Sequence, residues 1–191
     1  MKLQWNFLVC AVALCLLSGC TLPMAVSEVL QQPEGAKIYT RYNLWYTDPA
    51  AIPSRNIQQG RQLTAGSEIT AVYADENTLR IRDAAGNEYN ITFDAAIHLF
   101  TMRQFIRQFL TLTPPEKEFA GVREVMRKHV FRGEVVPGMN RAEVLAAYGP
   151  PVTSRTPDLG NESWIYWISA KETIRVVFRD NIVRNILNTN R

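Results

Sequence analysis

The chain has 191 residues, and its 21 Lys and Arg residues exceed its 18 Asp and Glu residues by only three. So small a net charge argues against nucleic acid as a partner and permits no more than a weak attraction to anionic lipid. The length is sufficient for one ordinary domain or two small ones, and the hydrophobic content of 47% is consistent with a buried core.

The N-terminal segment has the pattern of a secretory signal peptide. Lys2 precedes an apolar run over residues 7–17. This run of 11 residues is too short for a helix that crosses a bilayer, which needs about 20 residues. The run ends in Leu-Ser-Gly directly before Cys20, a pattern that resembles the lipobox of bacterial lipoproteins. The resemblance implies that residues 1–19 are removed and that the Cys20 thiol carries a covalent lipid.

A lipid on Cys20 would hold the protein on a membrane. Two or three acyl chains anchor a protein stably, because each buried methylene contributes about 0.8 kcal/mol. In the sorting rule of this lipoprotein class, Thr21 in place of an aspartate implies the outer membrane, with the protein facing the periplasm. Cys10 and Cys15 lie within the signal, so neither a disulfide nor a cysteine metal site is expected. No cofactor other than the lipid is expected.

Residues 20–36 are expected to form a lipidated tether. Pro23, Pro33 and Gly35 interrupt the segment, which shows little apolar periodicity. A coil of this length could extend about 50 Å. The folded part could then stand off the membrane or lie against it.

Residues 37–94 are expected to form a small β domain. Over residues 38–46, two sets of side chains alternate with a period of two residues, as in a half-buried strand. Pro49 and Pro53 then predict a loop. Further strands are expected over residues 68–73, 78–82 and 88–93. The Leu-Thr-Ala-Gly-Ser turn at 63–67 and the regular strand spacing resemble an SH3-like bacterial module, which implies a small β-barrel.

Residues 95–132 are expected to form a helical connector. Its first helix would carry an apolar stripe of Leu99, Met102, Ile106, Phe109 and Leu110. A second helix would begin at Thr113, whose spacing to Glu116 matches a capping box, and would run to about Phe131.

Basic residues mark the outer side of that second helix, namely Arg123, Arg127, Lys128 and Arg132. A solvated face is the simpler interpretation, with contact to anionic lipid as the alternative. His98 and His129 are isolated from other metal-ligand types, so packing or surface positions are expected for both.

Residues 133–191 are expected to form an α+β domain. Asn140 and Glu143 match the start of a capped helix, and Gly149 with two prolines behind it marks the end. Strands are expected over residues 163–169, 173–178 and 182–187, with an Asp-Asn hairpin turn between the last two. This order predicts a three-stranded antiparallel sheet with a helix or helix pair packed on one face.

A set of residues in this domain resembles a known family. They are Gly138, Met139, Glu143, Val144, Gly149 and Pro151, followed by an aromatic strand with Trp164 and Tyr166. Their types and spacing resemble the SmpA/OmlA-type lipoprotein of the outer-membrane β-barrel assembly machinery, over roughly residues 125–190. The resemblance implies an α+β module that acts by contact with other proteins. Residues 37–112 are an insertion relative to that family.

Aromatic residues on strands are the candidate functional residues. The sequence has no His-Glu-x-x-His or Gly-x-Ser-x-Gly motif, and an enzyme is not expected. Because aromatics are enriched at protein interfaces, Trp45, Tyr46 and Trp167 are candidate protein-binding residues. Trp164 and Tyr166 are expected in the core, and for Trp167 the core is an equal alternative.

The leading hypothesis is a non-enzymatic, membrane-anchored periplasmic lipoprotein. It would act by protein–protein contact in the assembly or maintenance of the outer membrane and envelope. One alternative is a module that binds peptidoglycan or another envelope polymer. The other is an inhibitor of a periplasmic enzyme.

Overall fold

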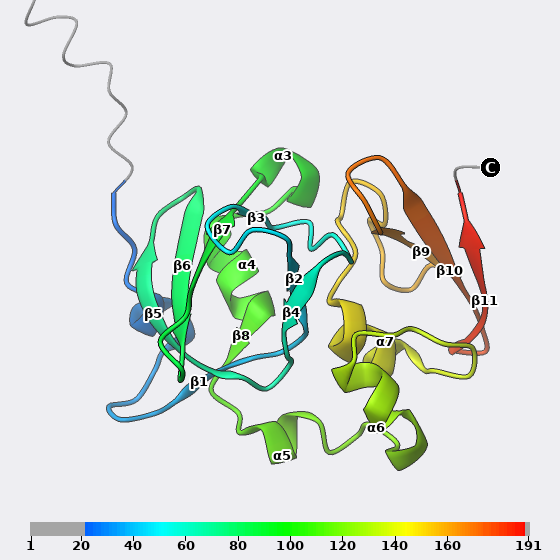
Figure 1. Ribbon diagram of the computed structural model, residues 1–191, viewed down its shortest axis with the longest axis horizontal. Helices are drawn as coiled ribbons and strands as arrows, with labels where there is room; N and C mark the ends of the chain where they lie inside the picture. Colours follow the sequence, from blue (N-terminus) through cyan, green and yellow to red (C-terminus); the bar gives the residue numbers. More distant parts are fainter. Residues whose placement is uncertain (1–21, 190–191) are drawn as a thin grey trace, which may run out of the picture.

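A computed structural model describes residues 22–189 as a mixed α+β protein with two packed units (Figure 1). The N-terminal unit is built around a curled six-stranded sheet, and the C-terminal unit around a three-stranded antiparallel sheet. The predicted α+β class and the predicted three-stranded sheet are therefore confirmed. Cys20, the expected lipidation site, lies outside the described residues.

Among the residues that the structure describes, eight strands lie in the N-terminal unit. They are β1 (Ile38–Thr40), β2 (Leu44–Tyr46), β3 (Ile52–Pro53), β4 (Arg61–Leu63), β5 (Glu68–Ala74), β6 (Thr78–Asp83), β7 (Glu88–Thr92) and β8 (Leu110–Thr111). The large sheet has the order β3-β7-β6-β5-β1-β8, with only β3 and β7 parallel among its described pairs. β2 and β4 form a separate antiparallel pair. The single strand expected over residues 38–46 is thus two strands in different sheets.

Helix α4 (Met102–Phe109) lies in the hollow of the curled sheet (Figure 1) and fills the N-terminal core. A complete capping box between Thr101 and Gln104 begins the helix. β8 follows at once and pairs with β1. The predicted connector over residues 95–132 is therefore wrong in its first half, because the buried face of α4 is part of the first core.

The placement of Leu99 in the apolar stripe of that helix is wrong. Helix α3 (Ala95–His98) ends at Leu99, which has a left-handed backbone with φ of 58°. The chain enters α4 only after Thr101, so Leu99 is out of phase with the buried stripe. Its side chain is 64% exposed.

The tether expected over residues 20–36 is wrong from Met24 onward. The Met24 N–H donates to the Ala74 carbonyl at 2.7 Å, and helix α2 (Val26–Leu30) begins two residues later. Val26 and Val29 are one helical turn apart, and both are buried in the N-terminal core. This apolar pair anchors the segment to the body.

The helix expected from Thr113 to Phe131 is broken in two. Helix α5 (Pro115–Glu118) is preceded by Pro114, so Thr113 is not its N-cap. The chain then leaves the helical path until α6 (Glu124–Phe131). Phe119 and Val122 are buried in the gap, and their packing separates the two helices.

The C-terminal unit contains helix α7 (Arg141–Tyr148) and strands β9 (Ser163–Trp167), β10 (Thr173–Arg179) and β11 (Ile182–Asn188). The sheet order is β11-β10-β9, and both pairs are antiparallel. Asp180 and Asn181 have φ of 52° and 66°, as a two-residue hairpin turn requires. Val144 and Ala147 of α7 share a buried core with the inner face of this sheet.

A buried amide, Asn43, joins the two units. Its side chain is fully buried, and its Nδ2 donates to the carbonyls of Val130 at 2.7 Å and Ala147 at 2.8 Å. Its Oδ1 accepts a hydrogen bond from the Ala65 N–H at 2.8 Å. Val130 and Ala147 lie in the last turns of α6 and α7, where carbonyls lack the usual helical donors. The Val130 carbonyl also accepts a hydrogen bond from the Gly133 N–H at 3.0 Å. One side chain therefore holds the ends of both helices against the N-terminal unit.

Two further amides extend this junction. Asn56 Nδ2 donates to the carbonyls of Asn43 and Tyr148, both at 2.9 Å. Gln62 Nε2 donates to the Phe131 carbonyl at 2.7 Å. Ala65, from the turn after β4, is buried in the core cluster of the C-terminal unit. The two units therefore share both polar and apolar contacts.

The substitution Asn43→Ala is expected to destabilise the whole chain. It leaves the Ala147 carbonyl and the Ala65 N–H buried without this partner, whereas the Val130 carbonyl keeps its hydrogen bond from the Gly133 N–H at 3.0 Å. Each buried group without a partner costs about 1–3 kcal/mol. We expect the free energy of unfolding in urea to fall by about 2–4 kcal/mol. Asn185→Ala, at an exposed position of β11, is the control and should have little effect. Equal stability of the two variants would contradict the role of Asn43.

Candidate functional site

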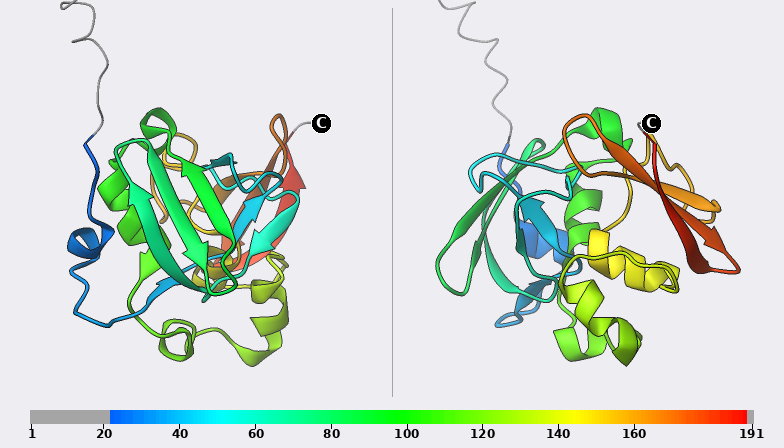
Figure 2. Two further views of the ribbon diagram at one scale, coloured as in Figure 1. Left: turned by 60° about the vertical axis from the view of Figure 1, so that its left-hand side comes forward. Right: turned by 45° about the vertical axis from the view of Figure 1, so that its right-hand side comes forward.

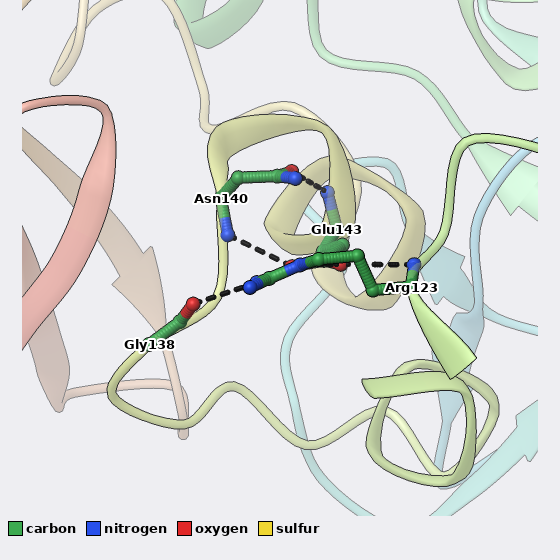
Figure 3. Close-up of polar contacts among 4 residues, drawn as sticks. All are labelled: Arg123, Gly138, Asn140 and Glu143. Carbon is green, nitrogen blue, oxygen red and sulfur yellow. Dashed lines mark hydrogen bonds and ion pairs between the residues drawn. The ribbon is translucent and has the colours of Figure 1, made fainter. Parts of the chain in front are cut away.

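The motif residues of the C-terminal unit form a scaffold around Glu143, which is fully buried. The Asn140 side chain accepts a hydrogen bond from the Glu143 N–H at 2.9 Å, and Glu143 Oε2 accepts one from the Asn140 N–H at 2.9 Å. Figure 3 shows this capping box and the guanidinium of Arg123 beside it. The predicted helix start is therefore confirmed in detail.

Arg123 binds the Glu143 carboxylate through two side-chain donors. Its Nε donates to Oε1 at 2.8 Å and its Nη2 donates to Oε2 at 2.6 Å. The Arg123 backbone N–H also donates to Oε1, at 3.1 Å, and Nη2 reaches the Gly138 carbonyl at 2.7 Å. Arg123 is exposed, as expected of a solvated basic face, but its guanidinium also ties the segment before α6 to α7.

The pKa of Glu143 follows from these contacts. Burial of the carboxyl acts to raise its pKa, but hydrogen bonds from Arg123 and from the Asn140 backbone outweigh burial and lower the pKa below 4.5. The hydrogen bond to Glu143 in turn raises the pKa of Arg123. The pair is therefore ionised at neutral pH and acts as a fixed structural link.

The motif glycines occupy backbone conformations that suit glycine. Gly138 has φ of 93° and Gly149 has φ of 75°. A Cβ on Gly149 would lie 2.6 Å from the Tyr42 ring, and the Gly149 carbonyl accepts a hydrogen bond from the Tyr166 hydroxyl at 3.0 Å. Gly149 therefore lets the N-terminal unit approach the end of α7 closely.

The remaining motif residues are buried. Met139, Val144 and Trp164 have no exposed surface, Tyr166 is 4% exposed, and Pro151 is also buried. The guanidinium of Arg141 covers Trp164, with its Cζ 5.1 Å from the ring centroid. The expectation that Trp164 and Tyr166 belong to the core agrees with this burial.

The three candidate binding aromatics are all half-buried, and each has different neighbours. Trp45 packs against Gly133 at the junction. The Tyr46 ring lies edge-on to Tyr89 at 5.3 Å. Trp167 lies between two arginines, with Arg55 Cζ at 5.1 Å and Arg155 Cζ at 5.9 Å from its ring centroid. A protein-binding role for these residues stays a prediction.

A cleft of about 380 Å³ opens where the two units meet, and we call it the junction cleft. The lining residues come from six places: the turn after β1, the end of α4, the end of α5, the segment between α5 and α6, α7, and the loop that follows α7. The lining residues are Arg41, Tyr42, Gln108, Glu118, Phe119, Gly121, Val122, Ala142, Leu145, Ala146, Pro150 and Leu159.

The junction cleft combines apolar walls with one charged pair. Arg41 Nε lies 3.6 Å from Glu118 Oε1, and the Thr111 hydroxyl bridges the two side chains with hydrogen bonds of 3.4 and 3.3 Å. Burial raises the pKa of the Tyr42 phenol, which keeps it protonated. Clefts between domains with apolar walls and few polar groups commonly bind ligands or peptide side chains.

The sequence alone does not reveal this cleft, because its walls come together only through the tertiary fold. The sequence pattern places Tyr42 in a continuous strand, and Phe119 and Val122 in a continuous helix. The one usable signal is Gly121, which lies between the two apolar residues and weakens the helix prediction there.

A second pair, Ser54 and His98, combines residue types that occur in catalytic sites. The His98 Nε2 lies 2.9 Å from the Ser54 hydroxyl, which also accepts a hydrogen bond from the Asp94 N–H at 3.2 Å. His98 is 4% exposed and stacks on Phe93, and burial lowers its pKa to about 4. The two side chains are buried and uncharged, so they are suited to packing inside the protein, as expected for His98.

Comparisons with protein-family models, curated proteins and solved structures gave no match for the chain. Within residues 22–189, no helix has the length and apolar character that crossing a membrane requires. In the same range, no three His, Cys, Asp or Glu side chains are grouped to hold a metal ion.

The substitution Glu143→Gln is expected to lower stability in a pH-dependent way. At neutral pH the loss should be about 1–3 kcal/mol, because hydrogen bonds to charged groups contribute about that much. The folded-state pKa of Glu143 is lowered, so its contribution is present above pH 4.5 and is lost as pH falls through the folded-state pKa. The stability difference between wild type and variant, measured by urea unfolding, should therefore shrink in acid.

Glu124→Gln provides the matched control. Glu124 pairs with Arg127 at 3.7 Å, and its side chain is 91% exposed, so the substitution should change stability little at any pH. A Glu143→Gln effect that is the same at pH 7 and in acid would contradict the proposed link.

Alanine substitution at two glycines compares a crowded position with an open one. Gly86 has φ of 88° and open space within 4 Å of the position that a Cβ would take, whereas Gly149 combines φ of 75° with ψ of 179° and meets the Tyr42 ring. We expect Gly149→Ala to lower the free energy of unfolding by about 1–3 kcal/mol more than Gly86→Ala, because overpacking costs about that amount and this backbone conformation is essentially restricted to glycine. Equal effects in urea unfolding would show that Tyr42 is not closely packed on Gly149.

Proposed function

We propose that the protein is a non-enzymatic lipoprotein, anchored through Cys20 to the outer membrane and facing the periplasm. It acts by contact with a partner protein in the assembly or maintenance of the envelope. The lipobox before Cys20 supports the anchor, and the SmpA/OmlA-like motif supports the setting. In this proposal the N-terminal unit is an SH3-like barrel and the C-terminal unit an SmpA/OmlA-like module.

The observation that carries the contact role is the junction cleft. It has apolar walls, a charged pair at Arg41 and Glu118, and a position between two units. An apolar side chain of the partner would fill the cleft, and polar groups beside it would meet the charged pair. Residues 118–122 border the cleft at the end of the molecule opposite α3 (Figure 1), where a partner can approach.

Site-specific photo-crosslinking in native envelopes tests this proposal. A photoreactive amino acid at Leu159, which lines the cleft and is 40% exposed, should give a discrete product with an envelope protein. The same group at Val125, which is 76% exposed on α6 and does not line the cleft, is the control and should not give that product.

The identity of the product separates the hypotheses. A component of the barrel-assembly machinery in the Leu159 product would support the proposed role. Identical products from Leu159 and Val125, or none from Leu159, would contradict contact through the cleft. Sedimentation of the full chain with purified cell wall would then favour the polymer-binding alternative.

A further inference from the structure

The folded body begins very close to the expected lipid anchor. Met24 is already fixed to β5 by its hydrogen bond of 2.7 Å to the Ala74 carbonyl, and Val26 is 5% exposed in the core. Three residues lie between Cys20 and Met24, and the four steps from one to the other span about 14 Å at most. A lipid on Cys20 would therefore hold one particular face of the body at the bilayer.

That face can be identified from the elements around Met24. The start of the described chain, the β5–β6 turn, α3 and the β9–β10 loop all lie at one end of the molecule, and Figures 1 and 2 agree on this. Hydrogen bonds connect several of these segments. The Phe93 N–H, just before α3, donates to the Asn77 carbonyl of the β5–β6 turn at 2.7 Å, and the Ser154 N–H donates to the Ile97 carbonyl of α3 at 3.0 Å.

Two exposed leucines belong to these segments. Leu22 is 80% exposed and Leu99 is 64% exposed. Leu99 directly follows α3, and its left-handed backbone turns it out of the core. Neither side chain contributes to the buried core of the body, so both can enter the apolar part of a lipid bilayer.

Trp167 and its two arginines adjoin the same face. Arg55 follows Ser54, whose hydroxyl contacts His98 of α3. Arg155 follows Ser154, which is bonded to Ile97. Trp167 is the last residue of β9, directly before the β9–β10 loop. A tryptophan flanked by arginines has the chemistry of a residue at the membrane–water interface.

We propose that this end of the molecule, here named the anchor face and defined by Leu22, Leu99, Trp167, Arg55 and Arg155, lies against the phospholipid surface. The inference rests on the proposed lipidation and adds the orientation of the body. The leucines enter the interfacial region, and the arginines meet lipid phosphates.

Acidic groups limit the electrostatic part of this contact. Asp94 caps α3 through its bond to the Ala96 N–H, and Glu76 is exposed in the β5–β6 turn. The face is therefore not uniformly basic, and the short anchor and the apolar side chains supply the orientation. The junction cleft, bordered by residues 118–122 at the opposite end, then faces the periplasm.

Depth-dependent fluorescence quenching tests the orientation. In the lipidated protein the Cys20 thiol is blocked, so the single thiol of Leu99→Cys can be labelled with an environment-sensitive fluorophore. The labelled protein is inserted into vesicles of phosphatidylethanolamine and phosphatidylglycerol that contain spin-labelled lipid. Val125→Cys is the matched control, because Val125 is 76% exposed on α6, which lies toward the opposite end of the body (Figure 1).

We expect quenching at position 99 to be several-fold stronger than at position 125. Mass spectrometry of the N-terminal peptide of the same preparation reports the lipid separately. Equal quenching at both positions with the lipid present would overturn the orientation and leave the proposed anchor intact. Absence of the lipid on Cys20 would overturn the proposed anchor and the orientation together.

Discussion

The structure depends on one buried side chain, Asn43, which satisfies both of its N–H donors with carbonyls from two different helices. These carbonyls, of Val130 and Ala147, lie at the ends of α6 and α7, where the regular helical donors are missing, although the Val130 carbonyl also accepts from the Gly133 N–H. Where water is excluded, a polar group without a hydrogen-bond partner destabilises the folded state. A buried network in which every polar group is hydrogen-bonded therefore favours a single arrangement of the packed elements. Asn43 therefore determines how the C-terminal unit sits on the N-terminal unit.

This junction matters for the proposed function because it makes the two units one body. The link between Cys20 and Met24 is short, so a lipid on Cys20 would restrain the N-terminal unit directly. Through Asn43 and the packing of Tyr42 on Gly149, that restraint would extend to the C-terminal unit. In the proposed orientation, the junction cleft, which both units line, would face away from the membrane.

Local sequence signals predict part of this fold well. The capping box at Asn140 and the hairpin turn at residues 180–181 depend on neighbours a few residues away, and both are present. Long-range contacts are not predictable in this way. By pattern alone, Asn43 is one residue of an alternating strand, Arg123 is one charge of a solvated face, and Leu99 is part of an apolar stripe. Their places depend on partners that are distant in sequence or on a helix break.

Native-state hydrogen exchange tests the coupling of the two units most directly. Ile81 on β6 and Val176 on β10 are fully buried, one in each core. If the units form one cooperative body, amides of the two central strands exchange only through global unfolding and report the same opening free energy. A markedly lower free energy for the β10 amides would show that the C-terminal unit opens alone, and would contradict a single body held by Asn43.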